Sequence, residues 1–571
     1  MIRKIWRYRN TEVKPVAVQR AADANNVPRI IANLLLNRGI SEADFAAFLV
    51  KSRKYIKNPM EMLDMEKAAD RIAEALKNEE KIVIYGDYDV DGITSTALLY
   101  EFLRSIGANA EYYIPDRKDE GYGINIMAVN KLIKQGVKLL ITVDCGITAI
   151  GEVEFAKLQG MDVIITDHHT CKERIPTAAV AVVNPKRPDD GYGFDGLAGV
   201  GVAFKLALAL AMKLGLNTGE VFDRYVDLAA IGTIADVVPL VDENRIIVSK
   251  GLDALQEPHR PGIRALFEVA GVADKKVTAS TIAFFAAPRM NAAGRLGTAV
   301  TSVELLLTRD ETRAKEIAEE LDRENRARQE TEQEINEQAL GMIAKDPGFA
   351  RKKVIVLACR EWHNGVIGIV ASRLVERFYK PTILISVSED GKGKGSGRSI
   401  SGFNLFDALA DSEELLTNFG GHAVAAGLGI NSDKIEEFEK KINKYADTYL
   451  TDSDMIPVVK IDCMLGGANL NLGLAKMLAN LEPYGMGNER PVFGVKDAAV
   501  TAISTVGTDN KHLRLQIEKD GTRVNCIGFG MGEYQRMIRT GCRVHIAFRL
   551  DINTYQGTES VQLQLVDIKT V

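Results

Sequence analysis

Three carboxylates stand at alternate positions in the segment IYGDYDVDGITST, residues 84–96, as Asp87, Asp89 and Asp91. Successive side chains of an extended chain point to opposite faces, so this spacing predicts that all three project to one side. Like charges that close repel one another, and a divalent cation is their natural compensator. An acidic surface loop is the alternative, because an isolated DxDxD pattern fits that as well.

Two further apolar runs end in acids. LLITVD ends at Asp144, and VIITD ends at Asp167, which His168 and His169 follow at once. Ligands of open α/β sheets bind outside the carboxyl ends of the strands, so acids delivered there by three strands favour a site over a loop. One more acid, Asp236, lies between apolar flanks, where an unpaired carboxylate would be costly.

The donor types indicate which ion such a site would hold. An Asp-rich set with one or two imidazoles suits Mg²⁺ or Mn²⁺ better than structural zinc. The chain's six cysteines are scattered without a CxxC pair, which disfavours a thiolate zinc site and a disulfide framework. Taken alone, these residues predict a metal-dependent hydrolase that acts on a phosphoester.

The elements that must position these residues form an alternating pattern from Lys81 onward. Apolar runs of strand length, KIVIY, AEYYI, KLLITV, DVIIT and AVAVV, are separated by helical patterns. This alternation predicts a parallel sheet with helices on both faces. Gly92 is expected to permit a tight turn after the first strand, and Thr94 or Ser95 to cap the helix that follows.

The rest of the chain predicts further domains. Residues 298–340 contain no Gly or Pro and are rich in Glu, Arg and Ala, and within them residues 311–340 predict one long exposed helix. Its charges indicate a solvated face by default, and the functional interpretation is that it spans two domains. A second α/β unit follows, with strands KVIVLA and TILISV and a glycine-rich turn, GKGKGSGR. Beyond Pro457, short alternating strands with polar turns favour a small β-barrel of the OB type.

The motifs GDYDVDG, VDCG, TDHH and GGHAVAAG together resemble those of the DHH phosphoesterase superfamily and its DHHA1 companion domain. YIPDRKDEGYG, PRMNAAGR and LEPYGMGNERPVF are similar to motifs of the single-strand-specific 5′→3′ DNA exonucleases of that superfamily. The resemblance runs from about residue 30 to the C-terminus. It implies an α/β multidomain protein with these parts: an accessory segment (1–50), a DHH catalytic domain (51–308), a connecting helix (309–346), a DHHA1 domain (347–450) and an OB-like nucleic-acid-binding domain (451–571).

The resemblance also implies a two-metal mechanism, in which Mn²⁺ or Mg²⁺ ions activate water and stabilise the attacking and leaving oxygens. Some relatives have a histidine at the position of Tyr85, and Asp87 or a water is expected to take its place. His169 would face the scissile phosphate, and Asp167 would orient an imidazole. The remaining implied ligands are Asp89, Asp91, Asp144 as the bridging carboxylate, His168 and Asp236.

Substrate contacts are implied in the same way. Arg117 matches a residue that receives the 5′-phosphate, and Tyr122 matches an aromatic that stacks on a base. The alternative for Arg117 is a surface salt bridge, and the alternative for the PRMNAAGR residues is a turn-stabilising arginine. The glycine-rich segment is alternatively only a turn. The other implied substrate contacts are Arg289, Asn291 and Arg295 in PRMNAAGR, and Arg373, Arg398 and His422 in the second α/β unit.

The charge balance limits how nucleic acid is recognised. The 571 residues include 72 Lys and Arg against 77 Asp and Glu, a formal net charge of −5, which excludes binding by bulk positive charge. We therefore expect a threaded groove with local basic groups and a specific 5′ end. No run reaches roughly 18 apolar residues and no signal-peptide core is present, so a cytoplasmic protein is expected.

Three functions are compatible with these residues. The leading one is a processive 5′→3′ exonuclease that releases mononucleotides from single-stranded DNA in repair and recombination, as a monomer, with single-strand binding protein and a helicase as partners. The alternative is a DHH-type phosphodiesterase for nanoRNA or cyclic dinucleotides, whose members are shorter and lack an OB domain. The third is an inactive nucleic-acid-binding scaffold, which would not require the acidic and histidine set.

Overall fold

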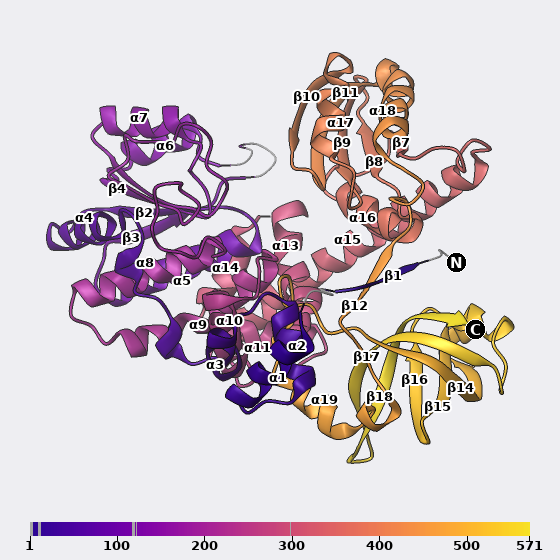
Figure 1. Cartoon of the computed structure of the whole chain (residues 1–571). Coiled ribbons are helices and arrows are strands. Elements are labelled where there is room, and N and C mark those ends of the chain that lie inside the picture. Colours follow the sequence, from indigo (N-terminus) through magenta and orange to yellow (C-terminus); the bar gives the residue numbers. More distant parts are fainter. Residues whose placement is uncertain (1–3, 10–12, 117–119, 121–122, 297) are drawn as a thin grey trace.

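The first domain is built around a five-stranded parallel sheet in the order β3-β2-β4-β5-β6 (Figure 1). The computed structural model describes residues 4–9, 13–116, 120, 123–296 and 298–571. The five predicted strands are confirmed. They are β2 (Ile82–Gly86), β3 (Ala110–Tyr113), β4 (Leu139–Val143), β5 (Asp162–Thr166) and β6 (Ala181–Val183).

Helices cover both faces of this sheet, as the continuous apolar strands require. Side chains alternate along β2, so Ile82 and Ile84 pack into one core while Val83 and Tyr85 pack into another. The first face is covered by α4 (Met65–Lys77), α5 (Val90–Ser105) and α8 (Gly199–Lys213). The second face is covered by α6 (Ile126–Lys134) and α7 (Ile150–Leu158).

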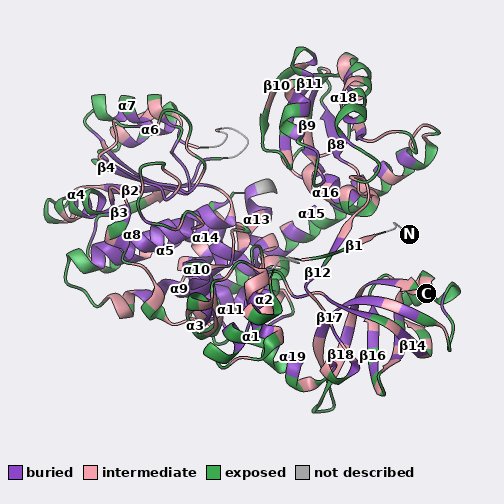
Figure 2. Cartoon of the chain, viewed as in Figure 1, coloured by how far each residue is buried: buried purple, intermediate pink, exposed green. Residues whose placement is uncertain are grey.

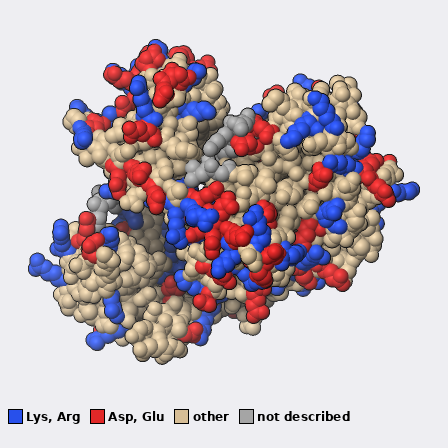
Figure 3. All heavy atoms as spheres, turned by 180° about the vertical axis from the view of Figure 1, so that it is seen from behind, with Lys and Arg blue, Asp and Glu red and all other residues tan. Residues whose placement is uncertain are grey.

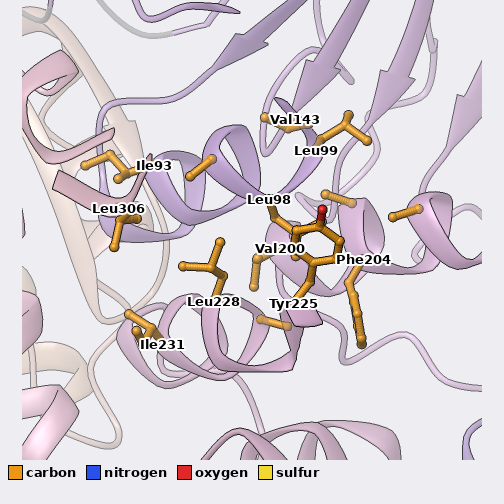
Figure 4. Packing of buried hydrophobic residues seen from close by; sticks show 14 of the residues in the cluster. Ile93, Leu98, Leu99, Val143, Val200, Phe204, Tyr225, Leu228, Ile231 and Leu306 are labelled. Carbon is orange, nitrogen blue, oxygen red and sulfur yellow. The ribbon is translucent and has the colours of Figure 1, made fainter. Parts of the chain in front are cut away.

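Helix α5 lies at the centre of the larger core and is buried around most of its circumference. Figure 4 shows Leu98 of this helix close to Val200 of α8 and Tyr225 of the next helix. Such all-round burial fixes the start of α5 firmly against the sheet. The other helices of the first domain are α9 (Thr218–Ala235), α10 (Asp242–Ala254), α11 (Pro261–Val269), α12 (Ala279–Thr281), a π-helical turn (Ile282–Ala286), α13 (Ala287–Leu296) and α14 (Val300–Leu307).

The predicted connecting helix is α15 (Glu311–Lys345), which runs for 35 residues. Asp310 caps it by accepting hydrogen bonds from the amides of Thr312 and Arg313 at 2.8 and 3.1 Å. Its first half buries residues such as Leu321 in the first domain, and its second half buries residues such as Ile335 in the second domain. The helix therefore links two cores, and one side of it is buried rather than exposed (Figure 2).

The second α/β domain has a mixed sheet in the order β10-β11-β9-β8-β7, in which only β7 and β8 pair in parallel. Its strands are β7 (Ile355–Cys359), β8 (Thr382–Val387), β9 (Lys392–Arg398), β10 (Leu416–Gly421) and β11 (Ala425–Asn431). Its helices are α16 (Ile367–Phe378), α17 (Leu405–Ala410) and α18 (Ile435–Tyr449).

The expectation that GKGKGSGR forms a turn is wrong, because this segment is the central strand β9. A Cβ added at Gly395 would lie 2.8 Å from Leu428 Cγ, and one at Gly397 would lie 2.7 Å from Leu405 Cδ2. The glycines therefore let neighbouring side chains pack directly on the strand backbone. The alternate residues of β9, including Lys394, point to the opposite face.

The C-terminal domain is a closed barrel, as predicted. Strand β14 pairs with both β15 and β17, and β18 pairs with both β16 and β17, so the sheet closes on itself. The barrel strands are β14 (Phe493–Val506), β15 (His512–Lys519), β16 (Thr522–Gly528), β17 (Arg543–Tyr555) and β18 (Thr558–Thr570). The short strand β13 (Cys463–Met464) and helix α19 (Leu472–Ala479) precede them.

The N-terminal segment packs on this barrel although it is far from it in sequence. Its helices α1 (Pro15–Ala24), α2 (Arg29–Asn37) and α3 (Phe45–Val50) share a core with barrel residues such as Phe493 and Phe548. In addition, β1 (Ile5–Tyr8) pairs in parallel with β12 (Val458–Ile461). The predicted accessory segment is thus structurally continuous with the OB-type domain.

One buried side chain joins three parts of the chain. Arg245 of α10 is 1% exposed and donates to the carbonyl oxygens of Phe48 at 3.0 Å and Glu482 at 2.9 Å. Its guanidinium carbon lies 3.8 Å from the centre of the Phe48 ring. Burial lowers the pKa of Arg245 to about 9. These contacts hold the N-terminal segment and the chain leading to the barrel against the first domain.

Acidic and basic side chains are intermixed over the face drawn in Figure 3, as the near balance of charges predicts. Among the described residues, no helix is both long and apolar enough to cross a membrane.

Candidate functional site

The predicted metal ligands converge at the carboxyl edge of the parallel sheet, beyond the ends of β2, β4 and β5. The structure places their donor atoms in overlapping clusters, within each of which the atoms lie no more than 4.8 Å apart. These clusters are Asp87, Asp89 and Asp144; Asp91, His168 and Asp236; and Asp144, His168 and His169. Three strand ends and the end of α9 therefore build one site, as the repeated acids indicated.

The first motif reaches this site by a different route from the one predicted. Strand β2 ends at Gly86 and α5 begins at Val90, so Asp87 and Asp89 lie in a strand-to-helix turn, Asp91 lies in the first turn of α5, and the three acids do not form an extended run. Asp89 is the N-cap of α5 and accepts a hydrogen bond from the Gly92 amide at 3.0 Å. The cap satisfies an amide at the helix start, which favours the turn over the extended chain.

Gly92 is needed for close packing rather than for a tight turn. A Cβ at this position would lie 2.5 Å from the carbonyl oxygen of Asp87. Neither Thr94 nor Ser95 caps the helix, contrary to expectation. Their hydroxyls donate instead to the carbonyls of Val90 and Asp91, at 2.7 and 2.6 Å.

Asp91 is held by the start of another helix. Its carboxylate accepts hydrogen bonds from the amides of Gly199 and Val200 in α8, at 2.6 and 2.7 Å. A helix N-terminus favours negative charge at this place. Even so, burial raises the pKa of Asp91 well above its usual value, and the nearby carboxylates of Asp236 and Asp89 raise it further. The ionised form therefore needs a further positive charge.

Asp144 follows β4 with a φ of 61°, in the left-handed region, and is 2% exposed. Non-glycine residues adopt this region at a cost, so the fold holds the carboxylate in place against local preference. Burial, followed by the charges of Asp91 and Asp89, raises its pKa well above the usual range. A Cβ at Gly199 would lie 2.6 Å from its Oδ1, so the start of α8 packs directly on Asp144.

His168 faces three carboxylates. Its Nε2 lies 3.2 Å from Asp144 Oδ1, 3.6 Å from Asp236 Oδ2 and 3.8 Å from Asp91 Oδ2. Burial lowers the pKa of His168 to about 3, which leaves a neutral imidazole with a lone pair to offer. Burial, and then Asp89, raises the pKa of Asp236 to about 7.

A divalent cation fits this arrangement. Within the described part of the chain, Asp144 Oδ1, His168 Nε2 and Asp236 Oδ2 are buried atoms that have no hydrogen-bond partner. Buried polar atoms are normally satisfied, and here each of the three is a ligand type for Mg²⁺ or Mn²⁺. The donor set, which is carboxylate oxygen with one neutral imidazole nitrogen, matches the ions that the sequence predicts.

Asp167 and His169 form a hydrogen-bonded pair, of which His169 also belongs to the cluster with Asp144 and His168. Asp167 accepts hydrogen bonds from the amides of His168 and Ile147 at 2.7 and 2.9 Å, and its Oδ1 lies 2.8 Å from His169 Nδ1. Burial would raise the pKa of Asp167, but His169 and the backbone amides hold it below its usual value. The His169 side chain is 44% exposed and is the part of this pair that faces the open side.

Tyr85 does not enter the site. Its hydroxyl donates to the carbonyl of Gly123 at 3.0 Å, and its ring stacks on Tyr113 with 5.3 Å between centroids. Its side chain belongs to the core on the other face of the sheet. Asp87, in contrast, lies in the cluster with Asp89 and Asp144.

Of the predicted contacts in PRMNAAGR, which lies in α13, Asn291 is beside the metal clusters and Arg289 is engaged elsewhere. The Val90 amide, at the start of α5, donates to Asn291 Oδ1 at 3.2 Å. Arg289 donates to Asp322 of α15 at 2.9 Å and to the Phe285 carbonyl at 2.7 Å, so it has a structural role in this arrangement.

The other predicted substrate contacts lie in the second α/β domain or outside the described residues. Arg373 of α16 is exposed and pairs with Glu332 of α15, while Arg398 donates to the Gly397 carbonyl at 2.8 Å. His422 is exposed beside β10. Arg117, Tyr122 and the side chain of Arg295 lie outside the described part of the structure.

Sequence reasoning missed the amides of Gly199 and Val200, which bind Asp91. The only signal for them is the small-residue run LAGVGVA, which begins a helix without a side-chain cap and so leaves amides for another acceptor.

Comparison with known proteins fits this architecture. Residues 81–233 match the N-terminal domain of the DHH family, residues 351–448 match the DHHA1 domain, and residues 461–567 match the RecJ OB domain. The single-stranded-DNA-specific exonuclease RecJ of Bacillus subtilis is 39% identical over 96% of this chain and 69% of that protein. The RecJ of Haemophilus influenzae is 36% identical over 91% of this chain and 92% of its own length. The chain belongs to the RecJ family.

Solved structures of RecJ agree with this membership. RecJ from Thermus thermophilus in complex with Mn²⁺ superposes with a TM-score of 0.84 at 32% identity, over 99% of this chain and 80% of that one. The same protein in complex with Mg²⁺ gives a TM-score of 0.79 at 31% identity, over 99% of this chain and 78% of that one. The sequence-based expectation of a DHH domain, a DHHA1 domain and an OB barrel is confirmed.

Proposed function

We propose that this member of the RecJ family is a metal-dependent exonuclease specific for single-stranded DNA. It would hydrolyse phosphodiester bonds from the 5′ end and release 5′-mononucleotides in DNA repair and recombination. The observation that carries the proposal is the convergence of the carboxylates and His168 at one edge of the sheet, with buried ligand atoms that lack partners among the described residues. The named activity of the relatives supplies the substrate class.

The residues divide naturally between two ions. Asp87, Asp89 and Asp144 would hold one, and Asp91, His168 and Asp236 would hold the other. Asp144 belongs to the first set and its Oδ1 lies 3.2 Å from His168 in the second, which suits a carboxylate that bridges both. When bound, Mn²⁺ or Mg²⁺ supplies Lewis acidity and lowers the pKa of water.

His169 would stabilise charge on the scissile phosphate. Burial alone would lower its pKa, but the contact with Asp167 raises it, so the ring carries a proton more readily than a free histidine does. Asp167 is fixed by backbone amides and in turn fixes the imidazole. A positioned cationic donor beside a reacting phosphate stabilises the transition state more than the ground state.

The substrate contacts stay proposals of the same kind. Asn291 is placed to orient the strand at the metal site, and Arg117, Tyr122 and Arg295 are proposed to contact it as the family motifs imply. Arg373, Arg398 and His422 would grip the strand farther along. Arg289 would have to exchange its pair with Asp322 to reach a phosphate. We further propose a cytoplasmic monomer that works with single-strand binding protein and a helicase.

One assay separates this function from its alternative. The purified protein is incubated with Mn²⁺ and either a 5′-labelled or a 3′-labelled single strand, a blunt duplex, or a cyclic dinucleotide. The expected result is early release of a labelled mononucleotide from the 5′-labelled strand only, with the duplex spared. Equal attack on both ends, or preference for the cyclic dinucleotide, would contradict the exonuclease and favour a DHH-type phosphodiesterase.

A further inference from the structure

Arg549 of β17 is a half-buried cation that none of the described residues neutralises. It forms no ion pair and no side-chain hydrogen bond with them, and its Nε is buried without a partner. Burial lowers the pKa of Arg549, and the neighbouring charge of Arg490 lowers it further. A desolvated guanidinium beside a second one is unfavourable unless an anion binds there.

The acids near Arg549 already have other partners. Arg549 lines a cleft of about 750 Å³ between the first domain and the barrel. Four carboxylates also line this cleft or its rim, and each is paired with a different cation. The pairs are Glu482 with Lys276 at 3.5 Å, Asp551 with Arg490 at 2.8 Å, Glu489 with Arg9 at 3.1 Å, and Asp253 with Lys250 at 3.5 Å. An anion for Arg549 must therefore come from a ligand.

This cleft adjoins a second hollow that borders the metal site. The second hollow, of about 490 Å³, is lined by Asn291, which contacts the start of α5, and by Ala235 and Val237 on either side of Asp236. The two hollows share Ser280 and Tyr484 among their lining residues. Together the two hollows extend from residues beside the metal ligands, past the π-helical turn, to Arg549 on the barrel.

The hollow beside the metal site has an apolar surface. Phe284, on the π-helical turn, is 73% exposed, and Met486, in the chain leading to the barrel, is 55% exposed. Aromatic and other apolar side chains at such a place accept the faces of nucleobases without sequence preference. The two hollows thus present apolar groups first and an unneutralised cation next, which complements the bases and the phosphates of one strand.

We propose that Arg549 binds a backbone phosphate of the single strand where the strand passes from the metal site to the OB barrel. The inference rests on the proposed function, because the second hollow borders the proposed metal ligands. It adds a binding site at the junction of the first domain and the barrel, several nucleotides from the reacting bond. Guanidinium suits this task because it binds phosphate through two parallel N–H donors.

The test is strand binding in an Asp144→Ala background, which keeps the DNA intact. Fluorescence anisotropy with labelled 5′-phosphorylated strands of about four and about twenty nucleotides separates a local contact from a distant one. Arg549→Ala should raise the Kd of the longer strand about threefold to tenfold and reduce the slope of log Kd against log salt by about 1. The shorter strand should bind equally well, and Arg549→Lys should recover part of the affinity.

Arg543→Ala is the matched control, because Arg543 lies on the same strand but is exposed and paired with Asp497. It should leave the Kd of both strands unchanged. Equal affinity and salt slope for Arg549→Ala and its parent would overturn the proposal, as would an equal loss in Arg543→Ala. Thermal midpoints check that both variants fold. Cleavage by the wild-type chain is measured separately, so a failure of the exonuclease proposal is distinguishable from a failure of the Arg549 site.

Discussion

His168 Nε2 lies 3.2 Å from Asp144 Oδ1, and neither atom has a hydrogen-bond partner among the described residues. Because burial lowers the pKa of His168 to about 3, the ring is neutral and the contact is not an ion pair. A neutral imidazole nitrogen and a carboxylate oxygen that face each other in a buried site are suited to bind a divalent cation. We therefore expect the replacement of Asp144 to lower the rate of cleavage more than the replacement of any other residue of the site.

Replacement of Asp144 by alanine should abolish cleavage while leaving strand binding largely intact. The carboxylate belongs to one proposed ion site, and its Oδ1 lies 3.2 Å from His168 Nε2 of the other, so its removal should lower the single-turnover rate by about 10³-fold or more. Asp274→Ala, which removes an exposed acid, is the control and should have the wild-type rate. Substantial residual cleavage in Asp144→Ala would mean that the metal site is assigned to the wrong residues.

Asp167→Asn should lower kcat about 10- to 100-fold with little change in KM, because Asp167 orients His169 rather than contacting substrate. The amide keeps an oxygen for the backbone donors but loses the charge that raises the pKa of His169. Steady-state kinetics on a labelled strand give the two constants, and a thermal midpoint reports any loss of folding. A rise in KM with kcat unchanged would show instead that Asp167 supports substrate binding.

Gly199→Ala should disable the site without touching a charged residue. The added Cβ would lie 2.6 Å from Asp144 Oδ1, so either the carboxylate or the start of α8 must shift. We expect cleavage to fall at least about tenfold, since small displacements of catalytic groups have effects of that size. Gly341→Ala in α15 is the matched control, because its Cβ would have no neighbour within 4 Å, and it should be neutral or slightly stabilising. Equal rates in the two variants would contradict the tight packing of α8 on Asp144.

The strand ends and the site acids were predictable from sequence because both depend on local pattern. Apolar β-branched runs identify β2, β4 and β5, and the acid that follows each run, such as Asp144 or Asp167, must lie at the same edge of a parallel sheet. The route of the first motif was not predictable, because the choice between an extended chain and an N-cap at Asp89 depends on contacts with α8. Strand β9 was mistaken for a turn because its glycines have a packing role that only the neighbouring Leu428 and Leu405 reveal.

Associations between distant segments were also beyond sequence reasoning. Nothing local in residues 15–50 indicates that they pack on a barrel that begins at Phe493. The alternation of polar and apolar residues shows that a helix buries one face, but not which surface covers it.

Stability at acid pH should depend on Glu101. It pairs with the fully buried Arg260 and with Arg224 at 3.0 Å. Burial alone would raise the pKa of Glu101, but the charge of Arg260 and hydrogen bonds hold it below the usual value. A folded pKa below the unfolded one gives stability that is present above about pH 4.3 and is lost as the pH falls through the folded pKa.

Glu101→Gln should therefore lower the free energy of unfolding by about 1.5–3 kcal/mol at neutral pH, because hydrogen bonds to a charged group are weakened. The difference from the wild type should shrink progressively below about pH 4.3. Urea unfolding at several pH values measures it, with Glu268→Gln, at an exposed position of α11, as the control. A difference that stays constant with pH would show that the carboxylate charge has no part in the effect.

Arg245→Leu should loosen the barrel and the N-terminal segment from the first domain. The guanidinium donates hydrogen bonds to the carbonyl oxygens of Phe48, Pro483 and Glu482, at 3.0, 3.3 and 2.9 Å. Its loss therefore leaves buried acceptors without donors. The expected cost is about 3–5 kcal/mol in the free energy of unfolding. Arg245→Lys should recover only part of it, because an ammonium group cannot reach the same acceptors with a planar fork.

Limited proteolysis should then cut near residues 480–490 faster in Arg245→Leu than in the wild type. The control Arg313→Leu, at an exposed position of α15, should be cut at the wild-type rate. An unchanged cleavage pattern with an unchanged midpoint of unfolding would mean that the apolar contacts of the shared core hold the domains together without Arg245.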